Sequence, residues 1–192
     1  MGVRVCSLSL VILAIFAALM LVPDSHPIPI SDISVPTVTV IDAGTGTIEG
    51  VAQRQGTQTD HAGVEVIGLS GDDGMTTTVT TAADGGFGLA VPMSRTYTIN
   101  ASYPGYLRSQ KGSVCVVSAT MDIGPTTLVA GNVNADNCIN ILDIVSIISK
   151  FGLTGLPASD PEDINDDGTI NILDLTVAAG NFTRCGPTVW AP

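Results

Sequence analysis

The sequence predicts a multi-domain chain of the β + α class, in which a small antiparallel β-sandwich is followed by a pair of loop–helix motifs. Short runs of alternating residues, separated by Gly, Pro and Asp turns, fill residues 47–128. A twelve-residue pattern then occurs twice, at residues 132–143 and 163–174, and an apolar stretch with helical spacing follows each copy. A period of two indicates strands, and apolar residues three and four apart indicate helices.

The first 24 residues are expected to form a secretory signal peptide. One cation, Arg4, precedes a nearly unbroken apolar run from Val5 to Val22, which is the order of charge and apolar core in such a peptide. The run also reaches the lower length limit of a membrane-spanning helix, so a retained membrane anchor is the alternative for residues 1–24. Both interpretations place the remaining chain outside the cytoplasm, either secreted or at the cell surface. Residues 25–44, rich in Pro, Ser, Thr and Val, are expected to form a linker.

The sandwich is predicted from seven short runs within residues 45–129. Turn residues such as Gly71, Gly85, Pro92 and Gly105 separate the runs at intervals of about eight to twelve residues, which is typical of a small antiparallel sandwich. The expected strands are residues 48–53, 64–69, 76–81, 87–91, 97–101, 114–117 and 121–128.

Several short motifs in this region resemble the carboxypeptidase regulatory-like domain, a transthyretin-like sandwich. They are Gly50-Val51, Ala62-Gly63-Val64-Glu65-Val66, Thr80-Thr81-Ala82-Ala83-Asp84-Gly85-Gly86-Phe87, Tyr97-Thr98-Ile99 and Pro104-Gly105-Tyr106. The resemblance implies an accessory domain without catalytic residues. Because some sandwiches of this shape bind carbohydrate, Tyr103 and Tyr106 are candidates for stacking on a sugar. The favoured interpretation makes Tyr103 an edge anchor and Tyr106 a core residue.

The repeated twelve-residue pattern has the spacing of a calcium-binding loop of the EF-hand type. Both copies carry oxygen-bearing side chains at loop positions 1, 3, 5, 9 and 12 and Ile at position 8. The sharp turn after position 5 requires a residue that tolerates positive φ, and Asn137 and Gly168 stand there. The chain carries 18 acidic and 7 basic residues, a net charge of −11, and eight of the acidic residues lie between Asp136 and Asp174. Such a chain is not expected to bind nucleic acid.

The two repeats resemble the type I dockerin module, in which each half is a calcium loop followed by one helix (an F-hand motif). The resemblance covers about residues 131–187, within an expected domain of residues 130–192. It implies two Ca²⁺ ions, with backbone carbonyls of Cys138 and Thr169 as ligands at position 7. The side-chain ligands it implies are Asn132, Asn134, Asp136, Asn140 and Asp143 in the first loop, and Asp163, Asn165, Asp167, Asn171 and Asp174 in the second. The second loop has three carboxylates and the first has two, so we expect the second loop to bind calcium more tightly.

The helices predicted after the loops, at residues 141–151 and 172–182, would contact a partner protein. Resemblance to dockerins implies calcium-dependent docking to a cohesin-type domain, as in assemblies that degrade polysaccharides, through loop positions 10 and 11. These positions are Ile141-Leu142 and Ile172-Leu173, identical in both halves, which favours an apolar contact that works in either of two orientations. The helix positions that often carry Lys-Arg in the family are Ile148-Ser149 and Ala179-Gly180 here. This departure argues against a standard cohesin partner.

The alternative is a structural cell-surface or matrix protein. In that case the Ile-Leu pairs would pack on the chain's own β-sandwich, since exposed apolar pairs need a covering surface. Neither alternative is an enzyme, because the sequence contains no nucleophile motif, zinc-protease motif or phosphate-binding loop.

Four cysteines and one tryptophan complete the set of informative residues. In the two-fold arrangement that the dockerin resemblance implies, the ends of the module come close, which predicts a disulfide between Cys138 and Cys185. Cys115 would then be free inside the sandwich, or else paired with one of those two. Trp190 is expected to pack near the termini.

Overall fold

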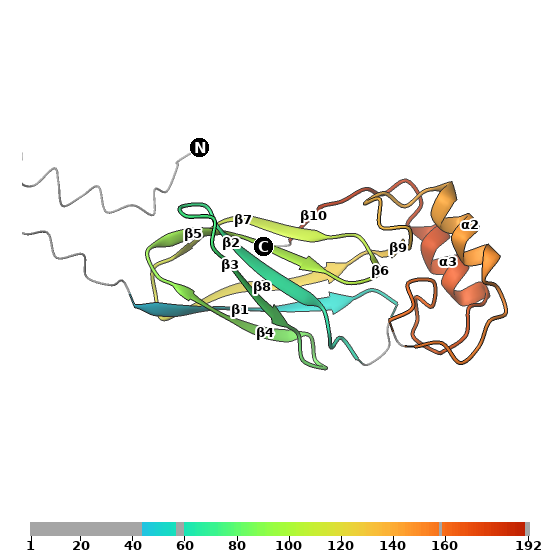
Figure 1. Ribbon diagram of the computed structural model, residues 1–192, viewed down its shortest axis with the longest axis horizontal. Helices are drawn as coiled ribbons and strands as arrows, with labels where there is room; N and C mark the ends of the chain where they lie inside the picture. Colours follow the sequence, from blue (N-terminus) through green and yellow to red (C-terminus); the bar gives the residue numbers. More distant parts are fainter. Residues whose placement is uncertain (1–43, 57–59, 158, 191–192) are drawn as a thin grey trace, which may run out of the picture.

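The computed structural model describes residues 44–56, 60–157 and 159–190 and contains an elongated β-rich body with two helices at one end (Figure 1). The expected signal peptide or anchor and residues 25–43 of the expected linker lie outside the described residues. The elements are β1 (Thr45–Arg54), β2 (Glu65–Ser70), β3 (Thr76–Thr80), β4 (Gly86–Pro92), β5 (Arg95–Ser102), β6 (Gly105–Tyr106), β7 (Ser109–Val116), β8 (Thr120–Leu128), β9 (Ala130–Asn132), α2 (Ile141–Ser149), α3 (Ile172–Gly180) and β10 (Thr188–Val189).

Two sheets form the sandwich, and a small strand pair extends it toward the helices. One sheet has the order β4-β1-β8, the other has the order β10-β7-β5-β2-β3, and β6 pairs with β9. The seven predicted strands are present. Three further strands, β6, β9 and β10, were not predicted because each has only two or three residues, too few to show a periodicity.

The prediction of a purely antiparallel sandwich is wrong at two pairings. Strand β1 pairs in parallel with β8, and β10 pairs in parallel with β7. The first pairing aligns Arg54 with Leu128, so both strands end at the same end of the sandwich. The chain therefore continues from β8 directly into β9 and the helices. Arg54 lies at the same end of the sandwich as the end of β8.

The core lies between the two sheets and follows from the alternation along each strand. Ile48 on β1, Leu89 on β4 and Ile99 on β5 are almost fully buried. Gly68 interrupts the apolar face of β2 because a Cβ atom there would lie 2.6 Å from Leu89 Cδ2. A glycine at this position allows the sheets to approach each other at the density of a protein interior.

Helices α2 and α3 begin at the predicted residues and end two residues earlier than expected. Asn140 and Asn171 are their N-caps, and the carboxylate three residues later completes a capping box in both cases. Each helix has nine residues, a length that requires tertiary packing for stability. Within the part of the chain that the structure describes, no helix has the length and apolar character needed to cross a membrane.

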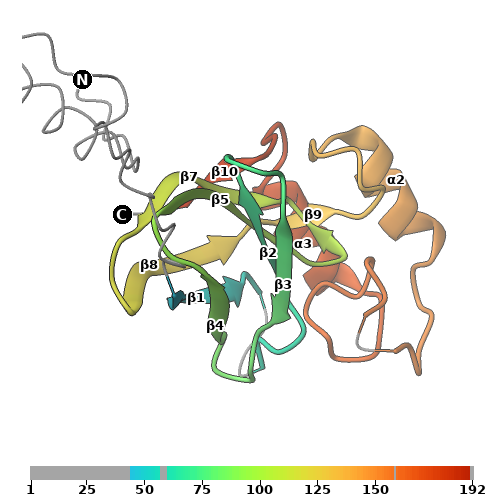
Figure 2. The same cartoon turned by 60° about the vertical axis from the view of Figure 1, so that its left-hand side comes forward.

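The helix pair packs against the end of the sandwich through α3, while α2 lies farther out (Figure 2). A Cβ atom on Gly131 of β9 would lie 3.0 Å from the Cα atom of Ala178 on α3, and one on Gly105 would lie 2.6 Å from the carbonyl oxygen of Pro161. Two glycines of the sandwich therefore allow the backbone of the helical region to approach closely.

After the helix pair the chain returns to the sandwich. Strand β10 adds to the edge of β7, and Trp190 is 2% exposed. Its ring packs edge-on against Phe87 at 5.9 Å between centroids, and its indole N–H donates to the carbonyl oxygen of Gly124 at 3.1 Å. The expectation that Trp190 packs is confirmed, and its site is the core of the sandwich.

Replacing Trp190 with Ala should lower the free energy of unfolding by about 3–5 kcal/mol, because it removes a large buried ring from the core. Chemical denaturation of the whole chain measures this. The matched control is Val189→Ala, at a neighbouring side chain that is 87% exposed, which should change stability by less than about 0.5 kcal/mol. Equal effects of the two substitutions would contradict the placement of Trp190 in the core.

Candidate functional site

The two twelve-residue loops have the same backbone conformation. Positions 4 and 6 have left-handed φ angles in both: 61° and 68° for Ala135 and Asn137, and 54° and 81° for Asp166 and Gly168. Left-handed φ is costly for residues other than glycine, so its recurrence at two non-glycine residues of position 4 indicates a requirement of the loop. The sequence predicted the turn at position 6 and did not predict the one at position 4.

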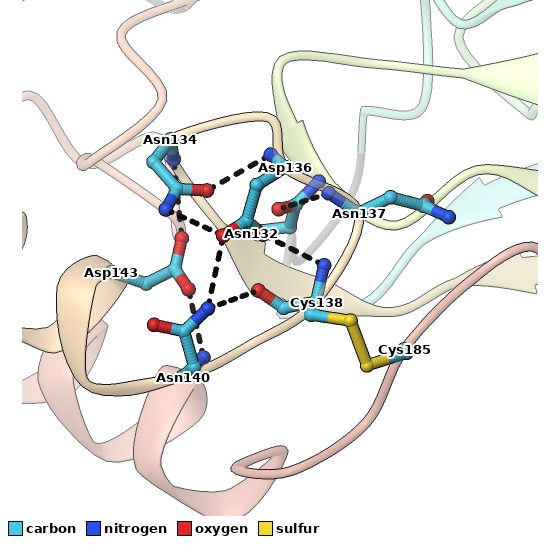
Figure 3. The surroundings of a disulfide bond; sticks show 8 residues. All are labelled: Asn132, Asn134, Asp136, Asn137, Cys138, Asn140, Asp143 and Cys185. Atoms are coloured by element: carbon cyan, nitrogen blue, oxygen red, sulfur yellow. Dashed lines mark hydrogen bonds between the residues drawn. A yellow bond between two sulfur atoms is a disulfide. The ribbon is translucent and has the colours of Figure 1, made fainter.

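The first loop gathers its side chains around Asp136 (Figure 3). The Oδ2 atom of Asp136 accepts from the side-chain amides of Asn134 and Asn140, at 3.0 Å each. Its Oδ1 atom accepts from the backbone N–H of Cys138 at 2.9 Å. These hydrogen bonds lower the pKa of the Asp136 carboxyl below its ordinary value, and the bond from Cys138 has the largest effect. Positions 3, 5, 7 and 9 of the loop therefore meet at one point.

The second loop repeats this arrangement around Asp167. Its Oδ2 atom accepts from the side-chain amides of Asn165 at 2.9 Å and Asn171 at 3.3 Å. At position 1, Asp163 accepts from the backbone N–H groups of Gly168 at 2.8 Å and Asp167 at 3.2 Å. Burial raises the pKa of Asp163. The hydrogen bond from the Gly168 N–H lowers this pKa in part, and the nearby carboxylates of Asp174, Asp167 and Asp166 raise it further. The second loop is thus more strongly charged than the first.

The carboxylate at position 12 is fully buried in each loop. Asp143 accepts from the backbone N–H of Asn134 at 3.1 Å and of Asn140 at 2.8 Å. Asp174 does the same for Asn165 at 3.2 Å and Asn171 at 2.8 Å. Each carboxylate therefore connects position 3 of its loop to the start of its helix.

The residues present fit a Ca²⁺ ion. Carboxylate, amide and backbone carbonyl oxygens meet in each loop, and these are the donors that this hard cation takes. Among the described residues, no Lys or Arg forms an ion pair with Asp143, Asp163 or Asp174, although all three are buried. The Asn side-chain amides donate N–H groups to Asp136 and Asp167. A rotation of each terminal amide by about 180° would point its oxygen to the same place.

Amide and carbonyl oxygens are indispensable to this fit. In the described part of the chain, no three carboxylate, imidazole or thiol groups lie close enough together to hold a metal ion. A site built from carboxylates alone is therefore absent there. In the first loop, most of the oxygen atoms around the ion would have to come from the predicted ligands Asn132, Asn134 and Asn140 and the carbonyl of Cys138.

The structure joins Cys138 to Cys185 in a disulfide, across 47 residues of sequence. This bond connects position 7 of the first loop to the segment after α3 (Figure 3). The alternatives stated for Cys115 are both wrong. Cys115 is disulfide-bonded rather than free, and neither Cys138 nor Cys185 is its partner.

The four predicted partner residues lie on the surface of the helix pair. Ile141, Leu142, Ile172 and Leu173 are 60, 61, 59 and 56% exposed. The internal contact proposed in the structural alternative is therefore wrong, because these pairs do not pack on the sandwich. Val145 and Ile148 of α2 are also 54 and 53% exposed. We call these six exposed apolar residues of the helix pair the docking face.

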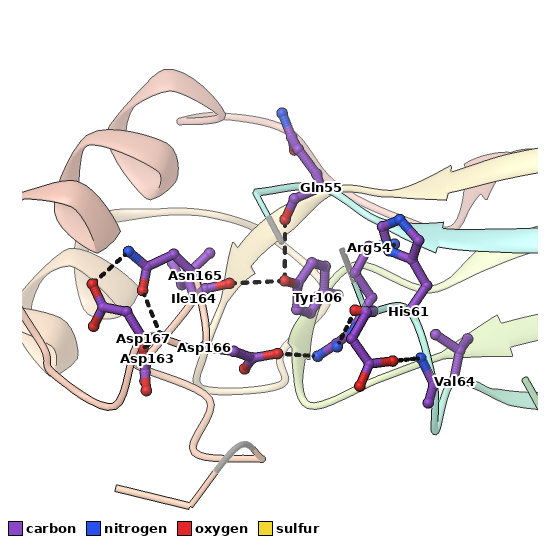
Figure 4. A network of polar contacts seen from close by, with 12 residues as sticks. Arg54, Gln55, His61, Val64, Tyr106, Asp163, Ile164, Asn165, Asp166 and Asp167 are labelled. Carbon is purple, nitrogen blue, oxygen red and sulfur yellow. Dashed lines mark hydrogen bonds and ion pairs between the residues drawn. The ribbon is translucent and has the colours of Figure 1, made fainter. Parts of the chain in front are cut away.

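The helix pair packs on the sandwich through other residues, which we call the joint (Figure 4). The hydroxyl of Tyr106 lies 3.1 Å from the carbonyl oxygen of Gln55 and 3.0 Å from that of Ile164. The side-chain amide of Asn181 donates to Gln55 Oε1 and to the carbonyl oxygen of Ala130, at 2.8 Å each. The joint comprises Arg54, Gln55, Tyr106 and Ala130 on the sandwich side, and Ile164, Asp166, Ala178 and Asn181 on the helical side.

The two tyrosines considered for sugar stacking belong to this region. Tyr106 is 6% exposed, as expected for a core residue, and burial raises the pKa of its hydroxyl far above the ordinary value. Tyr103 packs edge-on against Tyr106 at 5.7 Å between centroids. The guanidinium carbon of Arg54 lies 4.3 Å from the centre of the Tyr103 ring, an arrangement typical of cation–π contact. Both rings therefore serve packing.

No protein-family model and no curated protein matches the chain. Among the solved structures that match are two chains from type II cohesin–X–dockerin complexes of Acetivibrio cellulolyticus. A chain of an N-terminal interface mutant has a TM-score of 0.60 and 25% identity, covering 73% of this chain and 97% of that one. A chain of a C-terminal interface mutant has the same TM-score and coverage at 22% identity. The chain therefore shares its β-sandwich-containing fold with a component of cohesin–dockerin complexes.

Exchanging the residues at loop position 1 should change stability and calcium affinity in opposite directions. The raised pKa of Asp163 means that the calcium-free fold loses stability as pH rises from 3.8 through that pKa. Asp163→Asn should therefore make the calcium-free protein more stable at pH 7 and weaken calcium binding at the second loop. Thermal unfolding in chelator and calorimetric titration measure the two effects.

The matched control is Asn132→Asp at the equivalent position of the first loop. It should lower calcium-free stability and tighten the first site. If Asp163→Asn made the calcium-free protein less stable, this carboxylate would not be destabilising the fold.

Proposed function

We propose that the chain is a secreted, non-catalytic protein whose dockerin-like region, residues 130–192, binds two calcium ions and docks a cohesin-type partner. The single observation that carries this proposal is the docking face. Its two Ile-Leu pairs are more than half exposed, although Ala178 of α3 is packed into the joint. Apolar residues concentrated on one face of a folded domain mark a surface for protein–protein contact.

The geometry of the loops supports the calcium part of the proposal. Calcium, when bound, neutralises the carboxylates of each loop. The carboxylate at position 12 contacts the first turn of each helix, so the metal would also hold the docking residues at positions 10 and 11. Asp143 and Asp174 would remain ligands while accepting backbone N–H bonds, because a carboxylate oxygen that accepts one bond keeps a second lone pair.

The structural matches support the inclusion of the helical region. The matched part covers 73% of the 192 residues, about 140, whereas β1 to β9 span residues 45–132, which is 88. The shared fold must therefore extend past the sandwich. The matched complexes pair a cohesin with an X–dockerin unit, and by analogy we place this chain in assemblies of the kind that degrade polysaccharides.

The alternative function is that of a rigid component of the cell surface or matrix. The joint favours it, since the helix pair packs on the chain's own sandwich through Asn181, Tyr106 and Arg54. The two functions differ in the docking face, which a purely structural role would leave without a partner.

Replacing Leu142 and Leu173 with Asp should abolish capture by cohesin domains and leave thermal stability unchanged, because both side chains are exposed. A panel of immobilised cohesin domains, in calcium and in chelator, measures capture. The control is Val117→Asp, which changes a 70% exposed residue of the sandwich and should bind normally. Capture that is independent of these leucines, or no capture by any cohesin of the panel, would count against the docking function and favour the structural one.

The docking face is larger on α2 than on α3, and this predicts one preferred orientation of the partner. Val145 and Ile148 correspond to Thr176 and Ala179 after the repeat of 31 residues. Ile148→Ala should weaken partner binding by up to about 60-fold, since it removes three carbons at about 0.8 kcal/mol per buried CH₂. The reciprocal change Ala179→Ile should leave affinity unchanged or increase it. Little or no loss for Ile148→Ala would contradict a single preferred orientation.

A further inference from the structure

The two loops differ in what lies next to them, although their backbones are alike. In the first loop Asn134 and Ala135 are exposed to solvent, and the residues at position 5, Asp136 and Asp167, are exposed in both loops. In the second loop the equivalent residues Asn165 and Asp166 are half-buried. The difference arises because the second loop rests against the end of the sandwich, at the joint (Figure 4).

One side chain of the sandwich contacts the second loop at its position 4. Arg54 ends strand β1, its side chain is 4% exposed, and its Nη1 atom donates to Asp166 Oδ2 at 2.6 Å. Its Nη2 atom donates to the carbonyl oxygen of Asp60 at 2.6 Å, and its guanidinium lies over the Tyr103 ring. Three different groups therefore hold the guanidinium, which limits its freedom to follow the loop if the loop moves.

Position 4 of the second loop combines a left-handed backbone with a side chain that the sandwich contacts. Asp166 has a φ of 54°, a left-handed conformation that costs a non-glycine residue about 1–2 kcal/mol. The proposed calcium ligands Asn165 and Asp167 are its two neighbours, so their directions depend on this residue. In the first loop Ala135 has the same conformation and has no side-chain atom beyond Cβ to hold it.

A second contact fixes position 2 of the same loop. The Tyr106 hydroxyl lies 3.0 Å from the carbonyl oxygen of Ile164, and Gly105 allows β6 to approach Pro161 just before the loop. Positions 2 and 4 are therefore both held by the sandwich, on either side of the ligand at position 3.

We propose that Arg54 is a positioning residue for the second calcium loop. Its ion pair with Asp166 holds the left-handed turn at position 4, so that the calcium affinity of the second loop depends on the sandwich. This inference rests on the proposed calcium binding and adds to it a coupling between the two parts of the chain. Because coupling is reciprocal, calcium in the second loop also stabilises the joint.

Electrostatics and positioning make opposite predictions for Arg54→Met, which makes this the decisive variant. Removing a cation near a calcium site should strengthen calcium binding by Coulomb's law. Removing a residue that orients the ligands should weaken it, and residues of this kind are worth about 10–100-fold in metal affinity. We expect a loss of at least about 10-fold at the second site and no change at the first site, in calorimetric titration of the full chain with CaCl₂.

Three further variants test whether the effect of Arg54→Met comes from the ion pair or from a general folding defect. Asp166→Asn removes the ion pair and keeps a residue that tolerates left-handed φ, so it should weaken the second site without unfolding the chain. The double variant Arg54→Met with Asp166→Asn should be no weaker than Arg54→Met alone, since both changes remove the same interaction. Asp166→Ala copies the residue of the first loop and should behave like Asp166→Asn.

Amide hydrogen exchange in chelator gives a readout that does not involve the metal. Arg54→Met should speed exchange at the backbone N–H groups of Gly168 and Asn171 and leave those of Asn137 and Asn140 in the first loop unchanged. Unchanged or tighter calcium binding at the second site of Arg54→Met would overturn the proposal while leaving the proposed function intact. A wild-type chain that binds no calcium would overturn both, and the wild-type titration reveals this before any variant is compared.

Discussion

A buried carboxylate at the twelfth position of each loop is the constraint on which the helical region depends. Asp143 and Asp174 are fully buried, and each accepts one N–H from its loop and one from the N-cap of its helix. A buried charge is stable only with such partners. The carboxylate therefore fixes where the helix begins, where the loop closes and where the exposed Ile-Leu pair lies. A nine-residue helix has little stability of its own, so these contacts are necessary for α2 and α3.

The near two-fold symmetry of the repeats is broken by the sandwich. Helix α3 has Ala178 where α2 has Ile147, and the small side chain allows Gly131 to approach the helix. The helix that packs on the sandwich also has the smaller apolar surface on its exposed side. Helix α2 keeps Val145 and Ile148 in addition to its Ile-Leu pair. The second repeat therefore makes the closer contact with the sandwich, and the first contributes four of the six residues of the docking face.

In the described part of the chain, the segments before and after the helix pair are both attached to the sandwich. Strands β8 and β9 lead into the first loop, and β10 and Trp190 return to the sandwich after α3. The Cys138–Cys185 disulfide connects these two segments at the first loop, and the ion pair between Arg54 and Asp166 connects the sandwich to the second. A force applied by a partner at the docking face would therefore be transmitted to the sandwich through several contacts. This is the property that a protein–protein docking role would require.

The sequence by itself determined the elements whose causes are local. Alternating residues specified seven strands, a twelve-residue spacing specified both loops, and the Asn and Asp side chains at positions 9 and 12 specified the starts of both helices. It also identified Ile141-Leu142 and Ile172-Leu173 as contact residues, but left open whether they face a partner or the chain's own sandwich. Only the tertiary structure decided the parallel pairing of β1 with β8, the burial of Trp190 in the sandwich core and the joint around Arg54 and Asp166. An extra carboxylate at position 4, where the first repeat has alanine, was the one signal of that joint in the sequence. Its partner lies 112 residues away, and contacts between such distant residues depend on how the sheets pack, which no local pattern records.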